Sequence, residues 1–316
     1  MQVRRDILLF VTLAVVAIIG GVLLVLNRPG ATIDSFLKAA RERTTAARAN
    51  PANAEAFRAT VCAGGPCVLV EAGGLAILVG AGEGAAEGLA ARGLMRADLD
   101  AIILSDLTLD SVAGLPGVSR ASLAAGRRDR LKVYGPAGMV PVVDGVNLLL
   151  AAEPGVRLEV GTDKEDQGLE GLVVFDSGVV SIRAFGGREL GEGRVYRIDF
   201  EGKSLVIAGC RARPAEIVSA ARGTRSAASI LAAGSPQLLR GPADSCLPVK
   251  DVLEAAGQAR FDAILLSPLQ PSAMIPGSLA AWRQVLVTEK TGGAMVGGPG
   301  SVIDLSAGKP VLRPAG

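Results

Sequence analysis

Residues 7–26 form an uninterrupted apolar run, ILLFVTLAVVAIIGGVLLVL, without one charged side chain. A helix of this length rises about 30 Å at about 1.5 Å per residue, which matches the hydrocarbon core of a bilayer. A cleaved signal peptide is the alternative, but its apolar region is shorter and ends in small residues, whereas Asn27, Arg28 and Pro29 follow this run. We therefore predict that residues 1–28 form an uncleaved transmembrane anchor.

Basic residues lie on both sides of the apolar run. Arg4 and Arg5 favour a cytoplasmic amino terminus, while the basic residues at positions 28, 38, 41 and 43 favour the opposite orientation. We expect a single-pass protein whose body lies outside the cytoplasm, in the periplasm if the cell is bacterial. A cytoplasmic body is the alternative.

The rest of the chain divides into a stalk and a body. Residues 29–56 hold a short amphipathic pattern, which predicts a stalk helix ending at Asn50 and Pro51, followed by a linker. In the body, residues 57–316, short β-rich runs alternate with alanine-rich helical stretches, as is typical of a layered α/β domain. The predicted strands cover residues 67–70, 76–79, 101–104, 131–134, 179–184, 195–200, 204–207 and 263–266, and the predicted helices cover 85–92 and 248–258.

The charge of the chain from residue 29 onward argues against nucleic-acid binding. The whole chain has 33 basic and 31 acidic residues, and setting aside Arg4, Arg5, Arg28 and Asp6 leaves 30 of each. Nucleic-acid phosphates require clustered lysine and arginine. We therefore expect no nucleic-acid partner.

The chain contains no histidine. This excludes imidazole general bases, Ser-His and Cys-His nucleophile pairs, and every metal site that depends on an imidazole ligand.

Seven short motifs follow one another in the body. They read CAGGP at 62–66, ILVGAGEG at 77–84, ILSDLTLDSVAGLPG at 103–117, LKVYGP at 131–136, YRI at 196–198, GKSLVIAG at 202–209 and LLSPL at 265–269. Their order and spacing resemble the metallo-β-lactamase superfamily, most closely its ribonuclease Z and arylsulfatase-like branch. The resemblance covers about residues 57 to 305. It implies an αββα four-layer sandwich of a hydrolase family.

The same resemblance shows where the chemistry departs from the family. Family histidines correspond to Asp106, Thr108, Ser111 and Pro268, another falls near Glu189, and some members carry a catalytic histidine at Ser245. The family's bridging aspartate corresponds to Cys210, and only Asp110 keeps the family identity. These eight positions would form a vestigial pocket.

The remaining donors suit zinc poorly. Two zinc ions need about four to six nitrogen and oxygen ligands, whereas Thr108 and Ser111 offer neutral hydroxyls and Pro268 offers no side-chain donor. Asp106 and Asp110 could hold a hard cation such as Mg²⁺, but paired carboxylates in a turn are more often solvated. We therefore expect no metal and no cofactor.

Catalysis by a serine nucleophile and binding of a dinucleotide fit the sequence no better. The serines at 105, 111 and 245 lack a nearby base except Lys250, which follows Ser245. The glycine turn at 80–84 follows a strand, but its third glycine is misplaced for a dinucleotide fingerprint. Both features are expected to be structural turns and caps.

The resemblance also gives the four cysteines a context. It places Cys210 and Cys246 on two turns that the family's metals hold together. We predict a disulfide between them, which requires Cα atoms less than about 7 Å apart, and a weaker candidate pair in Cys62 and Cys67. Four buried thiols in a cytoplasmic body are the alternative.

The function predicted from the sequence is therefore that of a membrane-anchored, metal-free relative of the metallo-β-lactamase hydrolases, with a scaffold role or a binding role toward a protein or small molecule. The alternative is an active hydrolase with a non-standard metal site.

Overall fold

The computed structural model describes residues 54–62, 65–96, 98–153, 155, 157–163, 165–166, 171–233, 246–268, 284, 286 and 293–315. The predicted anchor at 1–28 and all of the predicted stalk up to residue 53 lie outside these residues. No helix in the described ranges is long and apolar enough to cross a membrane.

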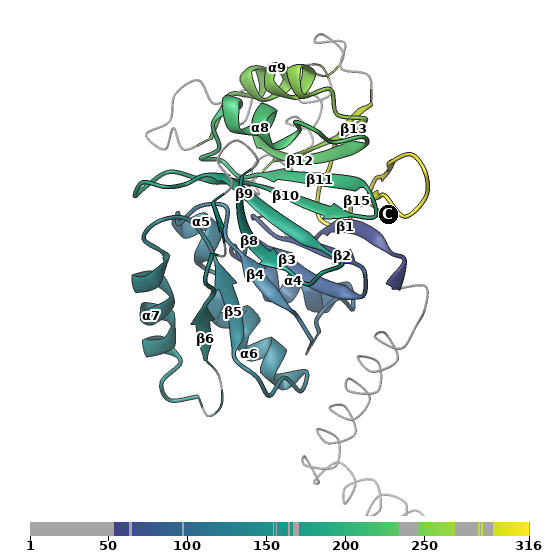
Figure 1. The fold of residues 1–316 in the computed structure, drawn as a ribbon. Helices are drawn as coiled ribbons and strands as arrows, with labels where there is room; N and C mark the ends of the chain where they lie inside the picture. The colour runs from purple at the N-terminus through teal and green to yellow at the C-terminus, as the bar shows by residue number, and fades with distance from the viewer. Residues whose placement is uncertain are drawn as a thin grey trace, which may run out of the picture.

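The described chain forms two eight-stranded sheets, stacked face to face (Figure 1). The first has the order β16-β15-β1-β2-β3-β4-β5-β6, and the second has the order β14-β13-β12-β11-β10-β9-β8-β7. The strands of the first are β1 (Phe57–Val61), β2 (Val68–Ala72), β3 (Leu75–Val79), β4 (Ala101–Ile103), β5 (Leu131–Tyr134), β6 (Leu158–Val160), β15 (Val302–Asp304) and β16 (Val311–Arg313). Those of the second are β7 (Glu165–Asp166), β8 (Leu172–Asp176), β9 (Ser181–Gly186), β10 (Arg194–Phe200), β11 (Lys203–Ala208), β12 (Ala227–Ala233), β13 (Ala263–Pro268) and β14 (Ala294–Val296).

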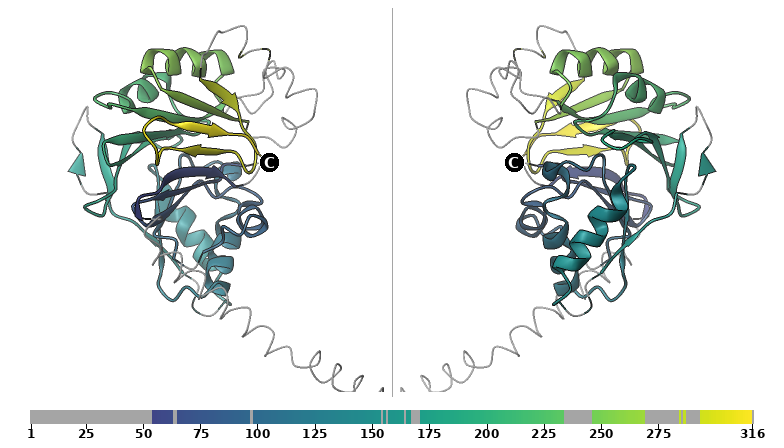
Figure 2. Two further views of the ribbon diagram at one scale, coloured as in Figure 1. Left: turned by 90° about the vertical axis from the view of Figure 1, so that its right-hand side faces the viewer. Right: turned by 90° about the vertical axis from the view of Figure 1, so that its left-hand side faces the viewer.

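Helices cover the outer face of each sheet (Figure 2). On the first sheet they are α4 (Ala85–Ala91), α5 (Leu109–Val112), α6 (Leu115–Ala124) and α7 (Met139–Leu149), and on the second α8 (Pro214–Ala220) and α9 (Val249–Ala259). In α9, Val249, Val252, Leu253 and Ala256 repeat at helical spacing and are all buried. The expected αββα arrangement of layers is therefore observed.

Both sheets are mixed, and this explains their sequence patterns. Strands β3 to β6 run parallel, as do β11 to β14, while β1, β2, β9 and β10 pair antiparallel. A parallel strand covered on both faces reads as a continuous apolar run, as LVIA does at the end of β11. One buried cluster fills the space between the sheets, and one lies beneath each helix layer.

Candidate functional site

The turn after β4 meets the second sheet at the ends of its parallel strands. The Tyr196 hydroxyl donates to the carbonyl of Leu104 at 2.8 Å, and the Arg194 N–H donates to the carbonyl of Ser105 at 2.7 Å. After β11, a Cβ on Gly209 would lie 3.0 Å from Asp106 Oδ2 and would overlap the Ser105 hydroxyl. These contacts place Asp106 at the junction of the two sheets.

Asp106 is 2% exposed, and its carboxylate is bonded within its own turn. Oδ1 accepts from the Thr108 N–H at 3.1 Å and from the Thr108 hydroxyl at 2.5 Å. Oδ2 lies 3.4 Å from the Ser105 hydroxyl, and the Thr108 and Ser111 hydroxyls are 3.3 Å apart. The turn therefore satisfies the carboxylate locally, as an Asx-type cap does.

The other positions of the expected pocket are distributed differently. Asp110 is exposed at the start of α5, and Glu189 is exposed in a turn where its N–H donates to Glu192 Oε2 at 3.3 Å. Pro268 ends β13, in register with Ala233 of β12, while Ser245 and the Pro268 side chain lie outside the described residues. The structure thus brings together Asp106, Thr108 and Ser111, and leaves Asp110 and Glu189 on the surface.

The cysteines are paired in the structure. Cys210 is bonded to Cys246, with Cα atoms 4.0 Å apart, and Cys62 is bonded to Cys67, with Cα atoms 5.3 Å apart. Cys210 directly follows Gly209, so the first disulfide lies beside the Asp106 turn. A sulfur in a disulfide is not available as a thiolate ligand.

A buried arginine at the junction was not predicted from the sequence. The Arg194 side chain is 7% exposed and pairs with Asp163 at 3.1 Å. The alternation of side chains along β10 could have predicted its burial. It places Arg194 on the same face of the strand as Tyr196 and Ile198, which point into the space between the sheets. A polar pair therefore occupies part of this junction.

Tyr196 does not provide a base at this site. Its side chain is fully buried, and burial raises the pKa of its phenol far above the usual range, although the nearby Arg194 guanidinium opposes this rise. The phenol therefore stays protonated at neutral pH and acts as a hydrogen-bond donor.

The donor set does not fit the two zinc ions of the resembled family. Across the part of the chain that the structure describes, no group of three or more His, Cys, Asp or Glu could hold a metal ion. Asp106 Oδ1 accepts two hydrogen bonds from Thr108, Asp110 is exposed, and the Cys210 sulfur is bonded to Cys246. A zinc site would have to displace these interactions while lacking imidazole ligands.

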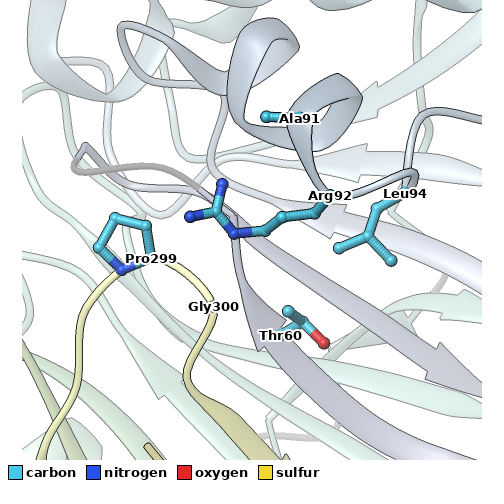
Figure 3. A pocket seen from close by; sticks show the side chains of 6 residues that line it. All are labelled: Thr60, Ala91, Arg92, Leu94, Pro299 and Gly300. Atoms are coloured by element: carbon cyan, nitrogen blue, oxygen red, sulfur yellow. The ribbon is translucent and has the colours of Figure 1, made fainter. Parts of the chain in front are cut away.

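Two hollows offer little for a ligand. A cavity of about 30 Å³ lies between the sheets next to Ser105, Gly209 and Ser267, and it has room for little more than water. A larger surface groove of about 450 Å³ lies between the end of α4 and the turn at 299–300 (Figure 3). Its charged side chain, Arg92, already donates to the carbonyl of Cys62 at 3.0 Å. Among the expected site residues that the structure describes, none lines this groove.

Comparisons with known proteins agree with the fold. The family model described as the metallo-β-lactamase superfamily matches residues 61–222. Ribonuclease Z of Mycobacterium marinum is 26% identical over 242 residues, which cover 71% of this chain and 86% of that protein. Ribonuclease Z of Methanopyrus kandleri is 37% identical over 102 residues, 30% of this chain and 36% of that one.

Solved structures show the same architecture. The metallo-β-lactamase-fold protein YhfI of Bacillus subtilis superposes with a TM-score of 0.58 at 16% identity, covering 79% of this chain and 99% of YhfI. The short form of human tRNase Z gives a TM-score of 0.55 at 16% identity, covering 69% of this chain and 94% of that enzyme. At these identities the likeness concerns the fold alone.

Proposed function

This chain belongs to the metallo-β-lactamase superfamily, with relatives of the ribonuclease Z type, and we propose that it is a non-hydrolytic member. In this proposal the fold is retained as a scaffold, or as a binding body for a protein or small molecule, and a membrane anchor holds it at a bilayer. Fold membership alone implies no reaction, so the proposal rests on the residues of the site.

The observation that carries the proposal is that groups at family metal-ligand positions are bonded to each other or to other residues of the chain. Asp106, at a family histidine position, is buried and bonded to Thr108, at another such position. Cys210, at the position of the bridging aspartate, is bonded to Cys246. A hydrogen bond at the first position and a disulfide at the second thus stand where the family has metal ligands. This supports a structural role for these residues.

A second candidate keeps the hydrolase activity of the family through an oxygen-ligated cation. The carboxylates of Asp106 and Asp110 on one turn favour it, since Mg²⁺ and Ca²⁺ prefer oxygen ligands. Asp110 is exposed, whereas the Asp106 carboxylate is buried and hydrogen-bonded to Thr108, which argues against their sharing an ion.

We expect the purified chain without residues 1–28 to contain no stoichiometric zinc, manganese or iron, because imidazole donors are absent and Cys210 is in a disulfide. Elemental analysis measures this directly. Phosphodiester, sulfate-ester and β-lactam substrates should remain intact with and without added Mg²⁺. One or more transition-metal ions per chain, or hydrolysis that depends on added cation, would favour the hydrolase candidate.

The proposed anchor is residues 7–26. Deleting residues 1–28 is expected to move the protein from the carbonate-resistant membrane fraction to the supernatant, because this run is the one apolar segment of spanning length in the sequence. A matched control replaces the run with an unrelated transmembrane segment and should restore membrane retention. If the truncated chain remains in carbonate-washed membranes, the anchor lies elsewhere. A reporter at the C-terminus would determine whether the body lies outside the cytoplasm.

A further inference from the structure

The connection to the anchor reaches the body at one end of the first sheet. Phe57, the first residue of β1, pairs with Ala72, which in turn pairs with Leu75 at the start of β3. Because β3, β4, β5 and β6 run parallel, the chain enters at the end where these strands begin. The Asp106 turn lies at the opposite end, where β4 finishes.

Two leucines are exposed at the entry end, on the last turn of α7. Leu148 is 76% exposed and Leu149 is 74% exposed. Asn147 holds this turn against the start of β6, because its side chain donates to the Leu158 carbonyl at 3.0 Å and accepts from the Leu158 N–H at 2.8 Å. Leu158 pairs with Leu131 at the start of β5. The last turn of α7 is therefore held at the same end of the first sheet as the loop that precedes β5 (Figure 1).

That loop carries positive charge. Residues 127–130 read Arg-Arg-Asp-Arg, a net charge of +2, whereas basic and acidic residues balance over residues 29–316 as a whole. Arg128 and Arg130 are exposed, while Arg127 is turned inward and donates to the Leu99 carbonyl. Exposed arginines beside exposed leucines are the combination by which proteins contact an anionic bilayer surface.

We propose that this entry face, defined as Arg128, Arg130, Leu148 and Leu149, lies on the headgroups of the membrane that holds the chain. The leucines would insert below the headgroups and the arginines would pair with lipid phosphates. The proposal rests on the proposed anchor at residues 7–26. The 27 residues between the anchor and Ala54 span at most about 90 Å when extended, so the body can reach the surface.

Docking of this face has a consequence for the rest of the molecule. The Asp106 turn and the Cys210–Cys246 disulfide lie at the opposite end of the parallel strands, and they would then point away from the bilayer. A soluble partner would approach that end without competing with lipid.

The test uses the full chain in vesicles that contain anionic lipid and lipids brominated on their acyl chains, which quench tryptophan within the bilayer. Trp282, the one tryptophan of the sequence, is replaced by phenylalanine, and Leu148→Trp is introduced. We expect its emission to be quenched and blue-shifted. Leu109→Trp is the matched control, since Leu109 is also 76% exposed but lies beside the Asp106 turn, and it should not be quenched.

Adding Arg128→Gln and Arg130→Gln to the Leu148→Trp chain should lower the ratio of docked to undocked bodies about 30-fold, because each arginine near an anionic surface contributes about a five-fold factor. The quenching should then be lost. Leu149→Trp repeats the measurement at the neighbouring exposed position, in case Leu148→Trp perturbs α7.

Carbonate extraction of the same chains separates the two proposals. A full chain that is extracted contradicts the anchor, and the docking proposal falls with it. The docking proposal alone is overturned if the chain stays in the membrane while the tryptophans of Leu148→Trp and Leu149→Trp, like that of Leu109→Trp, are neither quenched nor blue-shifted. A blue shift of these tryptophans that occurs only after a protein partner is added, without quenching by the brominated lipids, would also overturn it. That result would favour a protein-binding face.

Discussion

Replacing Gly114 with alanine is expected to destabilise the body by about 3 kcal/mol or more, because the new Cβ would meet backbone that has no room to move. It would overlap the Gly82 carbonyl oxygen and lie 2.9 Å from the Ala81 carbonyl oxygen. The Gly114 N–H donates to the same Ala81 oxygen at 2.8 Å. The turn between α5 and α6 therefore cannot move away from the turn after β3 without breaking this hydrogen bond. Urea unfolding of the chain without residues 1–28, followed by circular dichroism, measures the effect.

Gly145 supplies the control for this substitution. It lies within α7, and outside that helix's own backbone an added Cβ there would meet no atom of the described residues within 4 Å. Gly145→Ala should therefore be neutral or stabilise by up to about 1 kcal/mol, the difference in helix propensity. Equal urea midpoints for Gly114→Ala and the unmodified protein would show that the close contact of the two turns is not present in solution.

Breaking the Cys210–Cys246 bond is also expected to have a large effect on the free energy of unfolding. The two cysteines are 36 residues apart, and closing a loop of that length stabilises the folded state by about 3 to 4 kcal/mol in the chain-entropy model. A Cys210→Ser, Cys246→Ser chain should unfold at lower urea by an amount that corresponds to this loss. Non-reducing peptide mapping of protein from its own compartment tests the pairing itself.

The second disulfide is an internal comparison. Cys62 and Cys67 are only five residues apart, so removing that bond should cost about 2 kcal/mol in the same model. Alkylatable thiols at both Cys210 and Cys246 in protein taken from cells would contradict the pairing. They would also favour a body on the cytoplasmic side, where thiols are kept reduced.

The family and the order of layers could be predicted from the sequence, because turn motifs and apolar runs are local signals. The strand predicted at 131–134 has these bounds in the structure, and the strand predicted at 263–266 extends to Pro268. Other strands carry weaker signals. Strand β12 reads AASILAA, and alanine disfavours strands, so it was not predicted. Its position between β11 and β13, with every residue buried, overrides this preference.

For the site, the sequence by itself determined which ligands are absent, since a chain without histidine cannot supply imidazole wherever it folds. Only the tertiary structure decided how the remaining groups are used. Asp106 and Asp110 are four residues apart, yet one is buried and bonded to Thr108 while the other faces solvent. The ion pair of Arg194 with Asp163 joins residues 31 positions apart. Whether a side chain is buried, and which group it pairs with, depends on contacts between segments that are far apart in the sequence. These contacts form only when the two sheets pack against each other.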